Sequence, residues 1–307
     1  MQDVAAIGTG LIGKSWAIVF ARAGLNVRLF DADPARRQAV RGEIATDIET
    51  MAEQGLIADT REILHRIRVC ESIADAVTGV GYVQESVLEY IPVKTAVCAE
   101  IDDAIGPDVI VGSSSSGIPA SRFTEGLRNR ERFFVVHPVN PPHLVPLVEI
   151  VPAPWSDLTL TPRLRTFMEG VGQKPIVVNR EIEGFILNRL QGALLNEAWA
   201  LYAEGYASLA DIDLTVSHGL GARWSFMGPF ETIDLNAPGG IDDYASRLGG
   251  LYHSIARSRR DPQPWPEQVI EQARTERRSV LAAERIPERQ RWRDLTLMKY
   301  LAFSKTL

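Results

Sequence analysis

The sequence has little cysteine, little lysine and no long apolar run, and each shortage excludes a class of protein. Its two cysteines, Cys70 and Cys98, stand in apolar surroundings without the spacing of metal ligands, so we expect packed thiols, no disulfide and no metal site. No apolar run reaches the length of about 18 residues that spans a membrane, so we expect no transmembrane helix. A strand-like segment begins at Val4 and leaves no room for a signal peptide, which predicts a cytoplasmic protein.

Positive charge is also scarce. The net charge is −6 and the chain has five lysines, which argues against a nucleic acid as a partner. What is present is ordinary for a globular protein, with 45% hydrophobic and 23% charged residues. The 307 residues can bury a large core, and a chain of this length is expected to form two domains.

The first thirty residues hold the most informative pattern, in which Gly8, Gly10 and Gly13 have the spacing G-x-G-x-x-G. The apolar residues 4–7 before them predict a buried strand, and residues 11–23 after them predict a helix. Gly8 allows a tight turn, Gly10 lets a pyrophosphate approach the backbone, and Gly13 lets the helix pack closely on the strand. The pattern therefore predicts a dinucleotide-binding loop.

The free N–H groups of Leu11 and Ile12, at the start of this helix, are expected to face the cofactor phosphates. A second predicted strand, residues 26–30, ends at Asp31, where a carboxylate can accept hydrogen bonds from the ribose of the cofactor. This carboxylate would repel the 2′-phosphate of NADP. The next residues are Ala32 and Asp33, so no arginine follows Asp31 directly, and we predict NAD as the cofactor.

Strand and helix patterns then alternate up to residue 178, which indicates βαβ units and a parallel sheet. The sequence therefore predicts an α/β protein with an N-terminal Rossmann-type domain of parallel strands over residues 1–183. From residue 184 the pattern is helical, and we predict an all-helical C-terminal domain over residues 184–307. We expect this domain to serve substrate binding and dimerisation. A wide apolar helix face in it is consistent with a homodimer interface, although a core within the domain explains that face equally well.

Three polar features lie at the predicted carboxyl ends of strands, where such sheets bind ligands. Residues 113–116 are four serines that follow a short apolar strand, and His137 ends the strand of residues 132–137. Glu149 interrupts the apolar strand of residues 145–151, and a buried carboxylate needs a partner. Because a short loop joins the two strands, we predict that His137 and Glu149 form a catalytic pair.

Several of these stretches together resemble the 3-hydroxyacyl-CoA dehydrogenase superfamily, and the likeness covers nearly the whole chain. They are Ser116, His137-Pro138-Val139-Asn140-Pro141, Glu149 and Gly184-Phe185-Ile186-Leu187-Asn188-Arg189. Further stretches are similar to the branch of lambda-crystallin and L-gulonate 3-dehydrogenase in particular. These are residues 219–224, 228–232, 235–237 and 291–294.

The resemblance implies an NAD-dependent dehydrogenase that oxidises the C3 hydroxyl of a small anionic 3-hydroxy substrate, with L-gulonate as the leading candidate. It implies catalytic roles for Ser116, His137, Glu149 and Asn188, with Ser116 and Asn188 also binding substrate. It implies cofactor contacts from Glu89 and Lys94. The family resemblance also implies dimerisation through the helical domain.

The residues alone do not identify the substrate. Arg223 or Arg189 could bind the substrate carboxylate, since a guanidinium binds a carboxylate through two hydrogen bonds. A short 3-hydroxy acid, L-carnitine or a 3-hydroxyacyl-CoA are alternatives, and Trp224, Phe226 and Phe230 could form an aromatic cage for carnitine. The serine run and the loop that follows Asn140 depart from the acyl-CoA enzymes. A non-catalytic, crystallin-like NAD-binding protein is the alternative of another class.

Overall fold

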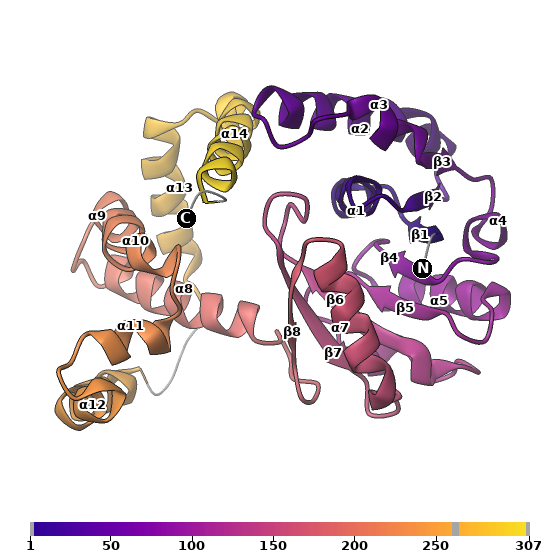
Figure 1. Ribbon diagram of the computed structural model, residues 1–307. Coiled ribbons are helices and arrows are strands. Elements are labelled where there is room, and N and C mark those ends of the chain that lie inside the picture. Colours follow the sequence, from indigo (N-terminus) through magenta and orange to yellow (C-terminus); the bar gives the residue numbers. More distant parts are fainter. Residues whose placement is uncertain (1–2, 260–263, 305–307) are drawn as a thin grey trace. The chain divides into compact units, whose positions relative to one another are not determined.

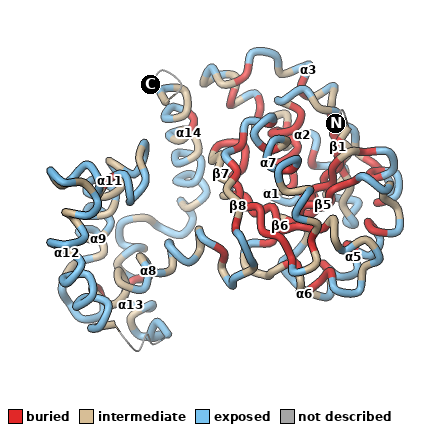
Figure 2. The backbone as a smooth tube through the Cα atoms, turned by 60° about the horizontal axis from the view of Figure 1, so that its bottom comes forward, coloured by how far each residue is buried: buried red, intermediate tan, exposed pale blue. Residues whose placement is uncertain are grey.

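A computed structural model describes residues 3–259 and 264–304, and these residues form two compact units (Figure 1). The first unit comprises Met1–Arg189 and Glu288–Leu307, and the second comprises Leu190–Pro287. Figure 2 shows that the buried residues are concentrated in the first unit. None of the helices in the described residues is both long and apolar enough to cross a membrane.

The first unit is built on an eight-stranded sheet with the order β3-β2-β1-β4-β5-β6-β7-β8. Its strands are β1 (Asp3–Ile7), β2 (Asn26–Phe30), β3 (Ile67–Val69), β4 (Tyr82–Glu85), β5 (Ile110–Ser113), β6 (Phe133–Pro138), β7 (Leu147–Pro152) and β8 (Lys174–Val177). The first six strands pair in parallel, as predicted. Strand β7 pairs antiparallel with β6, and β8 is parallel to β7. The segment between β6 and β7 is too short for a parallel crossover, which needs about a dozen residues.

Helices cover both faces of the sheet. They are α1 (Leu11–Arg22), α2 (Pro34–Glu53), α3 (Thr60–His65), α4 (Ile73–Val77), α5 (Ile91–Ala104), α6 (Ser121–Thr124) and α7 (Thr161–Gly170). One apolar cluster joins α1, α2 and α7 to alternate strand residues such as Val4 and Ala6, and the other joins α4, α5 and α6 to Ala5 and Ile7. Both cysteines are buried and free, as predicted.

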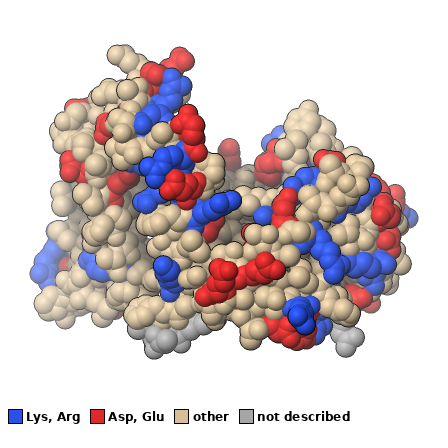
Figure 3. Space-filling model, turned by 90° about the horizontal axis from the view of Figure 1, so that it is seen from above, with Lys and Arg blue, Asp and Glu red and all other residues tan. Residues whose placement is uncertain are grey.

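The second unit is helical. Its elements are α8 (Leu187–Ala203), which begins in the first unit, α9 (Leu209–Leu214), a π-helical turn (Thr215–Leu220), α10 (Gly221–Trp224), α11 (Pro229–Leu235), α12 (Gly240–Ser258) and α13 (Glu267–Val280). Figure 3 shows acidic and basic side chains next to one another on the drawn face of each unit.

The last helix, α14 (Ile286–Ser304), belongs with the first unit over most of its length. Met298 is 4% exposed and lies in the apolar cluster of α1 and α2, and Leu295 and Leu301 pack against that cluster. The compact units therefore differ from our division at residues 183 and 184, because this helix buries its apolar side chains against the sheet domain.

Candidate active site

The carboxyl ends of β1, β2, β4, β5 and β6 meet at one edge of the sheet, together with the start of β7. The chain reverses its direction of winding between β1 and β4, and such a switch point is where open α/β sheets bind ligands. The glycine loop, Asp31, the serine run, His137 and Glu149 all lie at this edge.

The glycine loop has the shape that a dinucleotide requires. Gly8 has a φ of +90°, and a Cβ atom there would lie 2.6 Å from the carbonyl oxygen of Ser86. A Cβ atom on Gly13 would lie 1.8 Å from the carbonyl oxygen of Gly8, so any other residue would separate the helix from the strand. In contrast, no atom outside residues 9–11 lies within 4 Å of the Cβ position of Gly10, where a pyrophosphate would approach. The residues present therefore fit NAD.

The start of α1 is open toward this space. Gly10 is the N-cap residue and offers no side chain to the first turn of the helix. Leu11 is exposed and Ile12 is half-buried. Because the first backbone N–H groups of a helix have no partner within it, we expect those of Leu11 and Ile12 to bind the cofactor phosphates. This contact remains a prediction that the loop geometry supports.

Asp31 lies directly after β2, and its side chain holds Thr9 of the glycine loop. Its Oδ2 atom accepts hydrogen bonds from the backbone N–H of Thr9 at 2.7 Å and from the Thr9 hydroxyl at 3.0 Å. Its Oδ1 atom accepts one from the backbone N–H of Asp33 at 3.0 Å. Although no arginine directly follows Asp31 in sequence, Arg36 and Arg37 of α2 reach this loop, and Arg37 donates to the Asp31 carbonyl oxygen at 2.7 Å.

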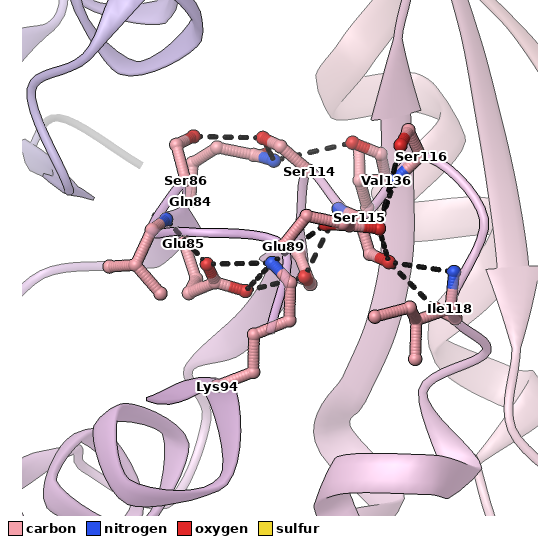
Figure 4. A network of polar contacts seen from close by, with 12 residues as sticks. Gln84, Glu85, Ser86, Glu89, Lys94, Ser114, Ser115, Ser116, Ile118 and Val136 are labelled. Carbon is pink, nitrogen blue, oxygen red and sulfur yellow. Dashed lines mark hydrogen bonds and ion pairs between the residues drawn. The ribbon is translucent and has the colours of Figure 1, made fainter. Parts of the chain in front are cut away.

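Glu89 lies between Lys94 and the serine run (Figure 4). Its Oε1 atom accepts hydrogen bonds from the Ser115 hydroxyl at 2.7 Å and from the backbone N–H of Ser116 at 2.9 Å. Its Oε2 atom lies 3.3 Å from the Lys94 ammonium. Burial acts to raise the pKa of Glu89, but these hydrogen bonds and the charge of Lys94 hold the pKa below its usual value.

Lys94 is 1% exposed, and its ammonium also contacts both carboxylate oxygens of Glu85 at 3.1 and 3.2 Å. The two acids enclose the ammonium, and a direct contact between Lys94 and the cofactor remains a prediction. Glu85 was not recognised in the sequence. It ends β4, whose residues are all buried, and a buried carboxylate needs a partner, as was argued for Glu149.

The predicted pairing of His137 and Glu149 is present. The two residues are cross-strand partners on β6 and β7, and His137 Nδ1 lies 2.8 Å from Glu149 Oε2. Glu149 is fully buried and His137 is 6% exposed. A carboxylate only accepts, so Nδ1 carries the proton and Nε2 is left free to act as a base.

Glu149 also binds the start of α8. Its Oε1 atom accepts hydrogen bonds from the backbone N–H groups of Ile186 at 2.8 Å and Leu187 at 3.0 Å. Burial acts to raise the pKa of Glu149, but the hydrogen bonds from His137, Leu187 and Ile186 lower it below its usual value. The carboxylate therefore stays charged and joins the imidazole to the first turn of α8.

Phe185 makes this connection possible, and the sequence did not single it out for this purpose. It is fully buried, its φ is +49°, and its ring lies 5.6 Å from the His137 ring. It follows Gly184, whose φ is +73°. A left-handed turn at these two residues aims the next N–H groups at Glu149, and a bulky residue adopts it only when its surroundings enforce it.

Asn188 and Ser116 are also brought together. The Asn188 side-chain amide donates a hydrogen bond to the Ser116 carbonyl oxygen at 2.5 Å. Ser116 is exposed and its hydroxyl donates a hydrogen bond to Glu89 Oε1 at 3.5 Å, whereas the neighbouring Ser115 is fully buried. Arg189 follows Asn188 and is exposed.

The remaining predicted substrate residues belong to the second unit. Arg223 is half-buried on α10, and the neighbouring Trp224, Phe226 and Phe230 are 41%, 66% and 74% exposed. Their part in substrate binding remains a prediction.

Residues 3–182 match the family described as the NAD-binding domain of 3-hydroxyacyl-CoA dehydrogenase, and residues 184–282 match its C-terminal domain. Lambda-crystallin of Oryctolagus cuniculus is 35% identical over 302 residues, which cover 97% of this chain and 94% of that protein. An L-carnitine dehydrogenase of Pseudomonas putida is 36% identical over 250 residues, which cover 81% of this chain and 77% of that enzyme.

Among solved structures, one similar fold is that of 5-formyl-3-hydroxy-2-methylpyridine 4-carboxylic acid 5-dehydrogenase, an NAD⁺-dependent dismutase. Its TM-score is 0.74 at 29% identity, and the match covers 94% of this chain and 99% of that one.

The fold and the site thus define an NAD-dependent oxidoreductase. The chain belongs to the 3-hydroxyacyl-CoA dehydrogenase family. The predicted fold class, family and cofactor are confirmed.

Proposed function

We propose that this protein oxidises the C3 hydroxyl of a 3-hydroxy carboxylate and that its substrate is L-gulonate, which becomes 3-dehydro-L-gulonate. The hydrogen bond between His137 and the buried carboxylate of Glu149 carries this proposal. It prepares the imidazole to act as a base at the carboxyl ends of the strands, where the glycine loop also lies. The choice of L-gulonate is supported by the branch-specific stretches of the sequence and by 35% identity to a lambda-crystallin over nearly the full chain.

His137 acts as the base in this proposal. Its free Nε2 atom takes the proton of the substrate hydroxyl, while Glu149 holds the proton on Nδ1 and stabilises the imidazolium that forms. A carbonyl group forms at C3 as the hydroxyl proton leaves. Microscopic reversibility requires that His137 returns this proton when the enzyme runs as a reductase.

Ser116 and Asn188 hold the reacting oxygen. Ser116 is an exposed residue of the loop that follows β5, and the Asn188 side chain donates a hydrogen bond to the Ser116 carbonyl oxygen of the same loop. Donors that are fixed before the reaction stabilise negative charge on an oxygen at little cost of reorganisation. Glu89 acts as a positioning residue, because it fixes the backbone of the loop that carries Ser116.

NAD, when bound, supplies the acceptor for the hydrogen of C3 and its electron pair. The residues that would hold it are Gly8, Gly10 and Gly13 with the first turn of α1, Asp31 at the ribose, and Glu89. Arg189 or Arg223 would bind the substrate carboxylate.

Oxidation of L-carnitine is the second candidate, and the similarity to L-carnitine dehydrogenases supports it. One from Oceanobacillus iheyensis is 37% identical over 76% of this chain. Carnitine carries a quaternary ammonium group, which aromatic faces such as those of Trp224, Phe226 and Phe230 could bind.

A panel of substrates tests the choice. NADH formation is measured with L-gulonate, L-3-hydroxybutyrate, L-carnitine and 3-hydroxybutyryl-CoA, and we expect the highest kcat/KM for L-gulonate. A higher value for another member would keep the mechanism and replace the substrate. Failure of all four, while NADH still binds, would contradict the proposed substrates and favour a non-catalytic, crystallin-like role.

We also propose that the second unit forms a homodimer. Only Tyr202, Thr232 and Ala273 are buried among its described residues, whereas large apolar side chains such as Phe230, Leu235 and Leu251 are more than half exposed. A helical unit with so little core commonly gains its stability from a partner. Sedimentation at micromolar concentration should give the mass of two chains, and the mass of one chain would contradict this.

A further inference from the structure

Arg36 lies beside the part of the glycine loop that Asp31 holds. Arg36 is on the first turn of α2, and its Nη2 atom donates a hydrogen bond to the Thr9 carbonyl oxygen at 2.7 Å. The N–H and hydroxyl groups of the same Thr9 donate to Asp31. The guanidinium and the Asp31 carboxylate are therefore attached to one residue of the nucleotide-binding loop.

A guanidinium at this place is the usual ligand for a 2′-phosphate, since its planar fork binds phosphate through two hydrogen bonds. Its position at the start of α2 adds to this, because the end of a helix where N–H groups are free favours an anion. The structure thus places a phosphate-binding group next to the carboxylate that excludes the phosphate.

Glu43 forms an ion pair with the Arg36 guanidinium through two hydrogen bonds. Its Oε1 atom lies 2.7 Å from Arg36 Nη1, and its Oε2 atom lies 3.2 Å from Arg36 Nη2. The hydrogen bond from Arg36 lowers the pKa of Glu43, so the carboxylate is charged at neutral pH. Lys14 of α1 is held in the same way, at 3.6 Å from Glu43 and 2.9 Å from Asp47.

We propose that Glu43 is a second determinant of the preference for NAD over NADP. Asp31 repels the 2′-phosphate, and Glu43 keeps Arg36 engaged and cancels its charge, so that Arg36 does not serve as a phosphate ligand. Removal of Asp31 alone then weakens the binding of NADH but leaves the 2′-phosphate of NADPH without a ligand. This inference rests on the proposed contact between Asp31 and the ribose, and it is independent of the substrate.

The test is the binding of reduced cofactors without substrate, followed by nicotinamide fluorescence. The dissociation constants of NADH and NADPH are compared for D31S, D31S/E43Q and D31S/D47N. Asp47 is the matched control, because it lies one turn further along α2 and pairs with Lys14, whereas Glu43 pairs with Arg36. D31S/E43Q should bind NADPH at least about tenfold more tightly than D31S/D47N.

The triple variant D31S/E43Q/R36A should lose this gain. Equal NADPH affinity in the two double variants, or an undiminished gain in the triple variant, would overturn the proposal. If D31S fails to fold, E43Q and D47N are compared in the presence of Asp31, where E43Q should lower the dissociation constant of NADPH more than D47N does. Unchanged NADH binding in a folded D31S would instead contradict the ribose contact of Asp31.

Discussion

Replacement of His137 by glutamine should lower kcat by about 10²–10⁴-fold and leave the dissociation constant of NADH unchanged. Glutamine keeps much of the size of the side chain and can still donate a hydrogen bond to Glu149. It has no nitrogen that takes up a proton near neutral pH, so the substrate hydroxyl loses its base. Steady-state kinetics with the best substrate of the panel and NADH titration measure the two effects separately.

The control is His65→Gln, which makes the same change at the end of α3. His65 lines a hollow with Asp3 and Asn26, at the start of β1 and β2, so it lies at the edge of the sheet opposite the site. This variant should keep the kcat of the unchanged protein. A kcat within a factor of about three in H137Q would exclude His137 as the base.

Replacement of Glu149 by glutamine should lower kcat by roughly 10³–10⁴-fold while the protein stays folded. The glutamine carbonyl can still accept the N–H groups of Ile186 and Leu187, which now bind Oε1. The glutamine NH₂ group then faces His137 Nδ1, which must accept instead of donate. The ring proton moves to Nε2, and the imidazole presents a donor where the mechanism needs a base.

Glu149→Ala separates this tautomer effect from the structural role of the carboxylate. Alanine leaves the N–H groups of Ile186 and Leu187 and the His137 Nδ1 group without their acceptor, so the free energy of unfolding should fall by about 3 kcal/mol or more. Denaturant unfolding should therefore rank E149Q above E149A in stability, although both have low kcat. Equal stability of the two variants would contradict the role of Glu149 in holding α8.

The acid stability of E149Q follows from the same contacts. The pKa of Glu149 in the folded protein lies below its usual value of 4.5, so the carboxylate contributes stability above pH 4.5 that is lost as the pH falls through the folded pKa. Glutamine does not titrate. Between pH 7 and pH 4, E149Q should thus lose less of its free energy of unfolding than the unchanged protein, and an equal loss would contradict this linkage.

Local patterns predicted much of this site. The glycine spacing and Asp31 belong to one continuous strand–helix–strand segment, and the structure keeps them together. A short loop joins the strands of His137 and Glu149, so the expectation that these strands are neighbours was enough to predict the hydrogen bond between the two side chains. In each case the deciding contact lies between elements that follow one another along the chain.

The features that the sequence did not reveal depend on contacts between distant segments. The hydrogen bond from Arg36 to Thr9 depends on how α2 lies beside the glycine loop. The position of α14 depends on the packing of Met298 against the core formed by α1 and α2. Neither relation leaves a periodic signal. The left-handed backbone of Phe185 is likewise set by its surroundings, because its residue type favours other conformations.

The most direct test of the proposed reaction is the fate of the hydrogen on C3. L-Gulonate that carries deuterium at C3 is incubated with NAD and the protein, and the NADH formed is examined by mass spectrometry. Our account predicts that the NADH carries the deuterium and that the product has its carbonyl group at C3. NADH without deuterium, or a product oxidised at another carbon, would contradict it.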